Sequence, residues 1–107
     1  MNIVLLIGRL THDVEIKEHP NGNYAHILLA VRRDFRNSDG NFDTDFLPIT
    51  LWEGAASTCK EYCKKGSLIS LKCRIQQNRW ESPDGKINYG IDIIGEKLSL
   101  ISNTNYK

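Results

Sequence analysis

The 107-residue chain has no run of apolar residues long enough to cross a membrane. It also has no glycine-rich loop of the Walker type, no carboxylate cluster suited to a metal ion, and no Ser-His-Asp set at a convincing spacing. Its apolar N-terminus has no basic region before it and reaches Arg9 too early for a secretory signal. We therefore expect a non-enzymatic protein without cofactor or membrane contact. Its expected location is the cytoplasm, with a nuclear or organellar location left open.

Cysteine is scarce and odd in number, with only Cys59, Cys63 and Cys73. Cys59 and Cys63 are four residues apart in an expected helix, so both can lie on one face of it. Two thiolates at this spacing with no nearby histidine do not make a zinc site, because structural zinc takes four ligands. We predict three reduced, mostly buried thiols and no metal.

Net charge is also small, at +1, and by itself it favours no partner. The charges are uneven along the chain, however. Residues 60–86 hold seven cations against three anions, and Arg32, Arg33 and Arg36 form a second basic cluster. Two such clusters on a neutral protein can guide a polyanion, although charge alone more often marks a solvated surface.

Alternation of apolar residues and turn signals predict a single domain of five strands and one helix. The expected helix is 54–65, ending in a basic turn with Gly66 placed to cap it. Pro48 inside the third strand fits only an edge or a bulge, and Gly90 and Gly95 are expected to bend the fifth strand. The expected strands are 3–10, 24–35, 44–52, 67–80 and 87–101.

This order of elements is typical of the OB fold, an all-β five-stranded Greek-key barrel with a helix between strands three and four. Turns are predicted at 20–23 and 82–86, between strands one and two and between strands four and five. The first strand is apolar at both parities except for Gly8 and Arg9, which predicts cover on both of its sides. In so small a protein, another subunit can supply the second cover.

The third strand separates two kinds of side chain. Aliphatic residues at 47, 49 and 51 alternate with Phe46, Thr50 and Trp52, so the aliphatic set faces the core and the rings face outward. The fourth strand repeats this layout, with Trp80 on the same parity as Lys72 and Arg74. An outward face that mixes cations with flat rings suits single-stranded nucleic acid, which offers phosphates to Lys and Arg and unpaired bases for stacking.

Seven short stretches, in order along the chain, resemble the bacterial-type single-stranded DNA-binding protein family. The resemblance runs from residue 1 to about residue 101. It implies an OB-fold DNA-binding domain at 1–101, followed by a short polar tail at 102–107. The matching stretches are Met1–Thr11, Pro20–Gly22, Leu29–Val31, Thr44–Phe46, Leu51–Trp52, Glu61–Ser67 and Arg79–Glu81.

The resemblance implies sequence-independent binding and protection of single-stranded DNA in replication, recombination and repair, at the nucleoid. Family members stack bases on aromatic residues, and the motif positions are aromatic here at Phe35, Phe46, Trp52 and Trp80. Phe42 and Tyr89 are either further stacking residues or ordinary aromatics. The candidates for additive, salt-dependent phosphate contacts are Arg9, Arg32, Arg33, Lys72, Arg74, Arg79 and Lys86. We rank Arg33, Lys72, Arg74 and Arg79 highest because they neighbour the aromatic positions, and Lys64 and Lys65 serve either phosphate or the helix end.

Members of this family typically form homotetramers, so we expect self-association, with a dimer as the alternative. Many also carry a flexible tail with an acidic tip that recruits other proteins, and residues 103–107 contain neither feature. We therefore expect no recruitment through an acidic tip by residues 1–107, which are either the core of a longer protein or a naturally short form. Two other functions stay open: a primosome-type accessory OB protein that acts mainly through protein contacts, and a relative that shares only the fold. RNA is also open as a ligand, since stacking and backbone attraction work on both polymers.

Overall fold

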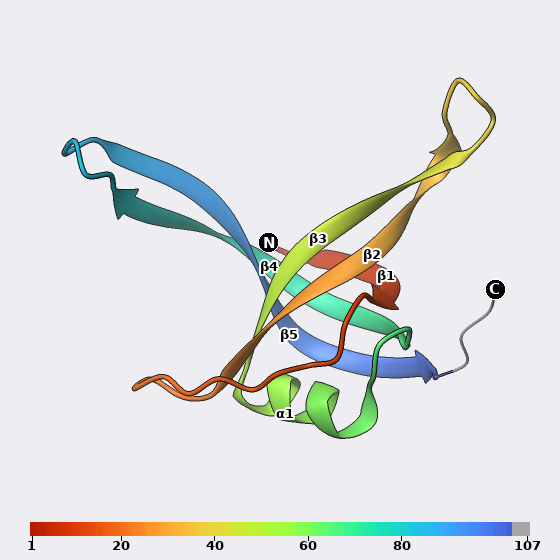
Figure 1. The fold of residues 1–107 in the computed structure, drawn as a ribbon, viewed down its shortest axis with the longest axis horizontal. Helices are drawn as coiled ribbons and strands as arrows, with labels where there is room; N and C mark the ends of the chain where they lie inside the picture. The colour runs from red at the N-terminus through yellow and green to blue at the C-terminus, as the bar shows by residue number, and fades with distance from the viewer. Residues whose placement is uncertain (104–107) are drawn as a thin grey trace.

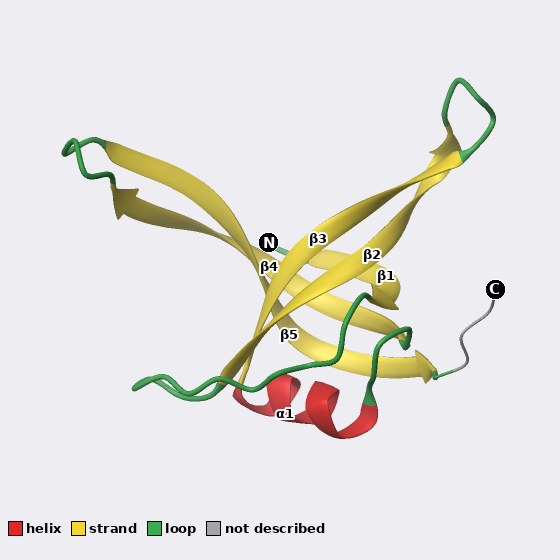
Figure 2. Ribbon diagram, viewed as in Figure 1, coloured by secondary structure: helices red, strands yellow, loops and turns green. Residues whose placement is uncertain are grey.

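Five strands close into a barrel in the computed structural model, which describes residues 1–103 (Figure 1). Neighbouring strands follow the order β1-β2-β3-β5-β4, and β4 pairs with β1 to close the barrel. The single helix in this part of the chain lies between β3 and β4 and covers one end of the barrel (Figure 2). The OB fold predicted from the sequence is therefore confirmed. The elements are β1 (Val4–Leu10), β2 (Tyr24–Arg36), β3 (Phe42–Trp52), α1 (Glu53–Tyr62), β4 (Leu68–Glu81) and β5 (Ile87–Ser102).

Most of the residues that the alternation assigned to the core are buried. Ile49 and Leu51 of β3 are almost completely buried, while Phe46 on the opposite parity is 59% exposed. Each aliphatic side chain buried in this way contributes about 1.5–3 kcal/mol. The other strands, the helix and the loop after β1 complete the core with Leu10, Val14, Ala25, Ile27, Leu29, Ala56, Cys59, Ile69, Leu71 and Cys73.

The cysteines are free thiols, as predicted, and two of them, Cys59 and Cys73, are buried. Burial raises the pKa of Cys59 to about 12, and the neighbouring Cys63 adds to this shift. Burial also raises the pKa of Cys63 and Cys73. The thiols therefore stay protonated at neutral pH and belong to the packing.

The helix ends three residues earlier than predicted, at Tyr62. Its C-cap is Cys63, which has extended backbone (φ −116°, ψ 156°), and Gly66 does not cap it. Gly66 instead takes φ +90° in the turn that leads into β4 and donates its N–H to the carbonyl of Leu10 at 2.8 Å. The chain has to leave the helix early because this turn is tied to the end of β1.

Pro48 lies within β3 opposite Leu28 of β2, and the ladder between β3 and β5 covers only residues 49–51. Pro48 therefore lies where β3 has a single neighbour, the edge position predicted for it. Gly95 lies at a register shift of the β4–β5 ladder, between the pairs Lys72–Lys97 and Cys73–Gly95, which agrees with the expected bend, and it is also a point of close packing. A Cβ there would come within 2.4 Å of the Leu51 side chain.

The two long hairpins extend beyond the barrel as diverging arms (Figure 1). We call residues 32–46 the β2–β3 arm and residues 75–93 the β4–β5 arm. Ile75 has the parity of the core residues, but it is 40% exposed because its strand has left the barrel at that point. Its backbone pairs with the side chain of Asn2, whose amide accepts from the Ile75 N–H and donates to the Ile75 carbonyl.

Among residues 1–103, the first strand is covered on one side only. Leu5 and Ile7 point outward and are 74% and 60% exposed, and Ile3 before them is 50% exposed. The ladder with β4 spans Val4 to Arg9, whereas the ladder with β2 contains only Arg9 and Leu10. The cover that the sequence predicts for the second side is not supplied by residues 1–103.

Candidate nucleic-acid interface

Trp52 ends β3 in a cluster of rings. It lies opposite Tyr24 of β2, with the ring centroids 5.2 Å apart and the planes inclined at 40°. His19 meets Trp52 edge-on at 5.8 Å, and His26 meets Tyr24 at 5.2 Å. The Nδ1 atom of His26 is hydrogen-bonded to the Thr50 hydroxyl at 3.2 Å. The indole is therefore half-buried and held in place by its neighbours.

A hollow of about 260 Å³ opens beside this cluster and reaches across to β4 and β5. We call it the Trp52 hollow. Its floor is the buried Ile94, and Gln76 and Asp92, which pair across the β4–β5 ladder, form one wall. Its full lining is His19, Tyr24, His26, Thr50, Trp52, Gln76, Asp92 and Ile94.

Sequence reasoning found Trp52 but missed the residues around it. Tyr24 and His26 share the parity opposite to the core residues Ile27 and Leu29, and this is the signal that could have found them. His19 comes from the loop before β2, where alternation gives no information.

Trp80 lies on the β4–β5 arm and is 51% exposed. It shares its parity with Gln76, so this face of the arm continues from the Trp52 hollow. The adjacent Arg79 lies on the other face, opposite Tyr89. The structure therefore separates Arg79 from Trp80, although they are neighbours in the sequence.

The β2–β3 arm presents two exposed rings, Phe35 (63%) and Phe46 (59%). The third ring of the arm, Phe42, is already in contact with cations. The guanidinium carbons of Arg32 and Arg36 each lie 4.4 Å from its centroid. A register shift in the β2–β3 ladder between Arg32 and Arg36 accompanies this arrangement. Phe42 therefore serves the arm as a cation–π partner.

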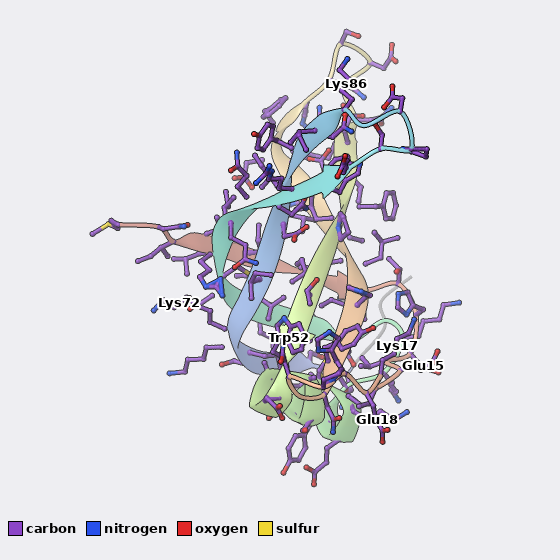
Figure 3. All side chains as sticks on the ribbon, turned by 90° about the vertical axis from the view of Figure 1, so that its left-hand side faces the viewer. Glu15, Lys17, Glu18, Trp52, Lys72 and Lys86 are labelled. Atoms are coloured by element: carbon purple, nitrogen blue, oxygen red, sulfur yellow. The ribbon has the colours of Figure 1, made fainter. Side chains whose placement is uncertain are left out.

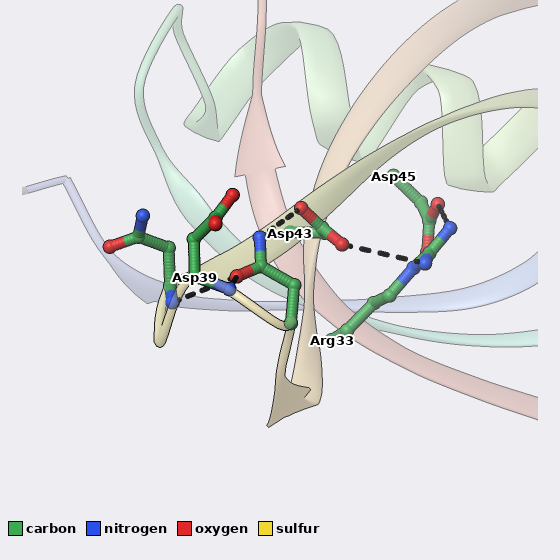
Figure 4. A network of polar contacts seen from close by, with 6 residues as sticks. Arg33, Asp39, Asp43 and Asp45 are labelled. Carbon is green, nitrogen blue, oxygen red and sulfur yellow. Dashed lines mark hydrogen bonds and ion pairs between the residues drawn. The ribbon is translucent and has the colours of Figure 1, made fainter.

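Arg33 is bound by carboxylates of β3 (Figure 4). Its Nε and Nη2 atoms donate to the two carboxylate oxygens of Asp45 at 3.0 and 2.9 Å, and its Nη1 lies 3.7 Å from Asp43. The hydrogen bond from Arg33 lowers the pKa of Asp45, so the pair stays charged across the neutral range. The basic cluster seen in the sequence is therefore offset by acidic residues of the same arm, namely Asp34, Asp39, Asp43 and Asp45.

The remaining predicted cations are spread over the molecule. Arg74 donates to Gln76 at 2.8 Å and lies 3.7 Å from Glu96. Arg9 is half-buried and donates to the carbonyl of Gly66 at 2.8 Å.

Two lysines lie elsewhere. Lys86 lies at the tip of the β4–β5 arm (Figure 3). Lys72 faces Lys97 across the β4–β5 ladder and lines a second hollow with Leu5 and Ile7, away from Trp52. Of the predicted cations, Arg32 therefore lies at the Phe42 ring and Arg74 reaches the Trp52 hollow through Gln76, whereas Lys72 lies away from both.

Together, the barrel face and the two arms present accessible rings over an extended surface, with charged side chains between them. This surface matches a long, flexible polymer with flat groups along it. A family model described as the single-strand binding protein family matches residues 1–101. The chain belongs to this family.

Relatives within the single-strand binding protein family agree with the match. The chain is 35% identical over 103 residues to single-stranded DNA-binding protein 1 of Clostridium acetobutylicum, covering 94% of each chain. It is 36% identical over 101 residues to single-stranded DNA-binding protein B of Bacillus subtilis, covering 94% of this chain and 89% of the relative. The single-stranded DNA-binding protein of Oceanobacillus iheyensis is 35% identical over 102 residues. That match covers 94% of this chain but only 63% of the relative's length. Family membership and these names support single-stranded DNA binding.

Proposed function

We propose that residues 1–101 form a domain that coats and protects single-stranded DNA without sequence preference, in replication, recombination and repair. The observation that carries this proposal is the exposure of the rings. Phe35, Phe46 and Trp80 are each more than half exposed, on strands whose alternate residues build the core. Such rings gain little from folding, whereas each base stacked on one contributes about 1–3 kcal/mol whatever its identity. Trp52 would add a fourth platform at the mouth of its hollow.

The phosphate contacts in this proposal are individually weak and additive. Arg79 and Lys86 are exposed and can follow a backbone, and Arg32 would do so from its place on the Phe42 ring. Arg33 must exchange the Asp45 carboxylate for a phosphate. The full proposed set is Arg9, Arg32, Arg33, Lys72, Arg74, Arg79 and Lys86.

Self-association into a homotetramer, with a dimer as the alternative, is the second part of the proposal. The outward side chains of β1 support it, because a row of exposed aliphatic residues on a strand is unusual for a monomer. Only Arg9 and Leu10 of β1 pair with β2. The backbone N–H and C=O groups that this leaves on the rest of that strand edge lie beside the aliphatic row, where a second subunit could pair with them.

Intrinsic tryptophan fluorescence during titration with oligothymidine tests the proposal. Stacking of bases on Trp52 or Trp80 is expected to quench the emission strongly, with tight stoichiometric binding at 50 mM salt. Binding should weaken at 200 mM salt because counterions are released from the phosphates. Absence of both quenching and binding at the lower salt concentration would reject the proposal.

A primosome-type accessory protein is the alternative, and one observation favours it. The basic residues of the β2–β3 arm are offset by four aspartates, which weakens the attraction of this arm for phosphates. A low affinity for oligonucleotides together with a dimeric mass in solution would support this alternative.

The Arg33–Asp45 pair yields a prediction within the proposed function. Replacing Asp45 by asparagine removes the charge that competes with phosphate for Arg33, so we expect an affinity for oligothymidine about two- to fivefold higher. Fluorescence titration at 50 mM salt measures the change. The matched control is Asp39→Asn, which removes the same charge from the same arm at a residue that contacts Asn37 through its backbone. Equal gains from the two variants would mean that only the net charge matters.

A further inference from the structure

The ring of Trp80 rests against the backbone of β5 at Gly90. A Cβ placed on Gly90 would lie 3.1 Å from Cζ3 of Trp80 and 3.0 Å from Oδ1 of Asn78. In the ladder, Trp80 is directly opposite Asn88, and Gly90 is opposite Asn78. The indole therefore extends diagonally across the arm, into the space that a side chain at position 90 would fill.

The backbone at Gly90 does not require glycine. The glycines with left-handed φ values are Gly22, Gly40, Gly66 and Gly85. Glycine within a strand weakens it and often marks a site where another group approaches closely. At Gly90 the approaching group is the Trp80 ring. Glycine therefore matters here because it has no side chain, which leaves room for the ring.

Asn78 lies between the Trp80 ring and the Trp52 hollow. Its Nδ2 donates to Oδ1 of Asp92 at 2.6 Å, and Asp92 forms part of the hollow's wall. The Oδ1 atom of Asn78 is buried and has no hydrogen-bond partner among the described residues. This oxygen lies by Gly90, next to the indole, so the amide and the ring share the space above the glycine.

We propose that Gly90 and Asn78 are positioning residues for single-stranded DNA binding. Gly90 leaves the space in which the Trp80 ring settles against the arm, and Asn78 braces it through Asp92. A ring held in this way presents one face to a base, at a fixed separation from the Trp52 hollow. Binding then does not have to order a freely rotating indole. The inference rests on the proposed function, because it assigns these residues a role in the same interface.

Replacing Gly90 by alanine tests the proposal, because a methyl group there would lie 3.1 Å from the ring, closer than an ordinary contact, so the ring has to shift slightly while alanine suits the strand. We expect the affinity for oligothymidine to fall about threefold to tenfold. This is smaller than the loss expected from deleting the ring altogether. In a Trp80→Ala background, the same substitution should cause no further loss. The matched control is Gly54→Ala in α1, where an added Cβ meets no atom within 4 Å. Anisotropy of a labelled oligonucleotide measures every variant, and thermal unfolding checks that each one folds.

A second measurement does not depend on DNA. In a Trp52→Phe background Trp80 is the single tryptophan, and Gly90→Ala is expected to increase acrylamide quenching of its emission in the free protein. Asn78→Ala should act in the same direction. Unchanged quenching, or a Gly90→Ala loss that persists in full without Trp80, would overturn the positioning role. If the parent chain binds no oligonucleotide, the proposed function fails and the DNA-binding role of Gly90 fails with it, whereas increased quenching would still show that Gly90 holds the ring.

Discussion

The double substitution of Phe46 and Trp80 by alanine is expected to weaken the affinity for oligothymidine at least roughly thirtyfold. Each ring contributes about 1–3 kcal/mol through stacking, and every 1.4 kcal/mol is a factor of ten. The two rings lie on different arms, so their losses should add. Because both are more than half exposed, the fold should survive their removal. Anisotropy of a labelled oligonucleotide measures the change without needing Trp80.

The control for this experiment is Tyr62→Ala. Tyr62 is 57% exposed, close to the values for Phe46 and Trp80, but it lies on α1 away from both arms. A loss no larger than that of the control would contradict base stacking on these rings. Trp52 needs a gentler change, because it packs on Tyr24 and His19. Trp52→Phe keeps a ring in the cluster and removes only part of its surface.

Charging the outer face of β1 is expected to have the second large effect. Leu5→Asp with Ile7→Asp should convert the proposed homotetramer or dimer into monomers. Each aliphatic side chain buried between subunits contributes about 1.5–3 kcal/mol, and each buried, unpaired carboxylate opposes association. In a symmetric assembly these losses repeat at every copy of the interface. Light scattering or analytical ultracentrifugation at several concentrations measures the mass.

Ile91→Asp serves as the control for this second experiment. Ile91 is 71% exposed, similar to Leu5, but it lies on the β4–β5 arm. We expect the Ile91→Asp variant to have the same mass in solution as the unmodified protein. If the β1 variant keeps the parent mass, subunits do not associate through this face.

Much of the fold could be predicted because it rests on local patterns. The alternation around Ile49 and Leu51 identified both the core and the outward rings, since a strand offers only two faces. The end of the helix could not be predicted this way. The cations at 64 and 65 continue a helical pattern, but the turn at Gly66 is bound to Leu10, a residue far away in the sequence.

The candidate site depends even more on contacts between residues that are distant in the sequence, which local patterns do not predict. The sequence reveals Arg33 as part of a basic cluster, but its pairing with Asp45 depends on the register between β2 and β3, which places Asp45 opposite Val31. The rings around Trp52 also depend on this register. Ranking Arg79 by its closeness to Trp80 overlooked alternation, because adjacent residues in a strand face opposite ways. Of the expected tail, residues 104–107 lie outside the part of the chain that the structure describes.

The closure of the barrel has a consequence for the order of folding. Each arm is a hairpin of residues close in sequence, and such contacts form quickly because the loops to be closed are short. Closure joins Val4 to Cys73 and Ile49 to Ile93, so it has to fix much longer loops. We therefore expect the arms to form first and β1 to dock late. The apolar face of β1 would then take its final shape only when the barrel is complete. Subunits would therefore associate through this face only after each one has folded.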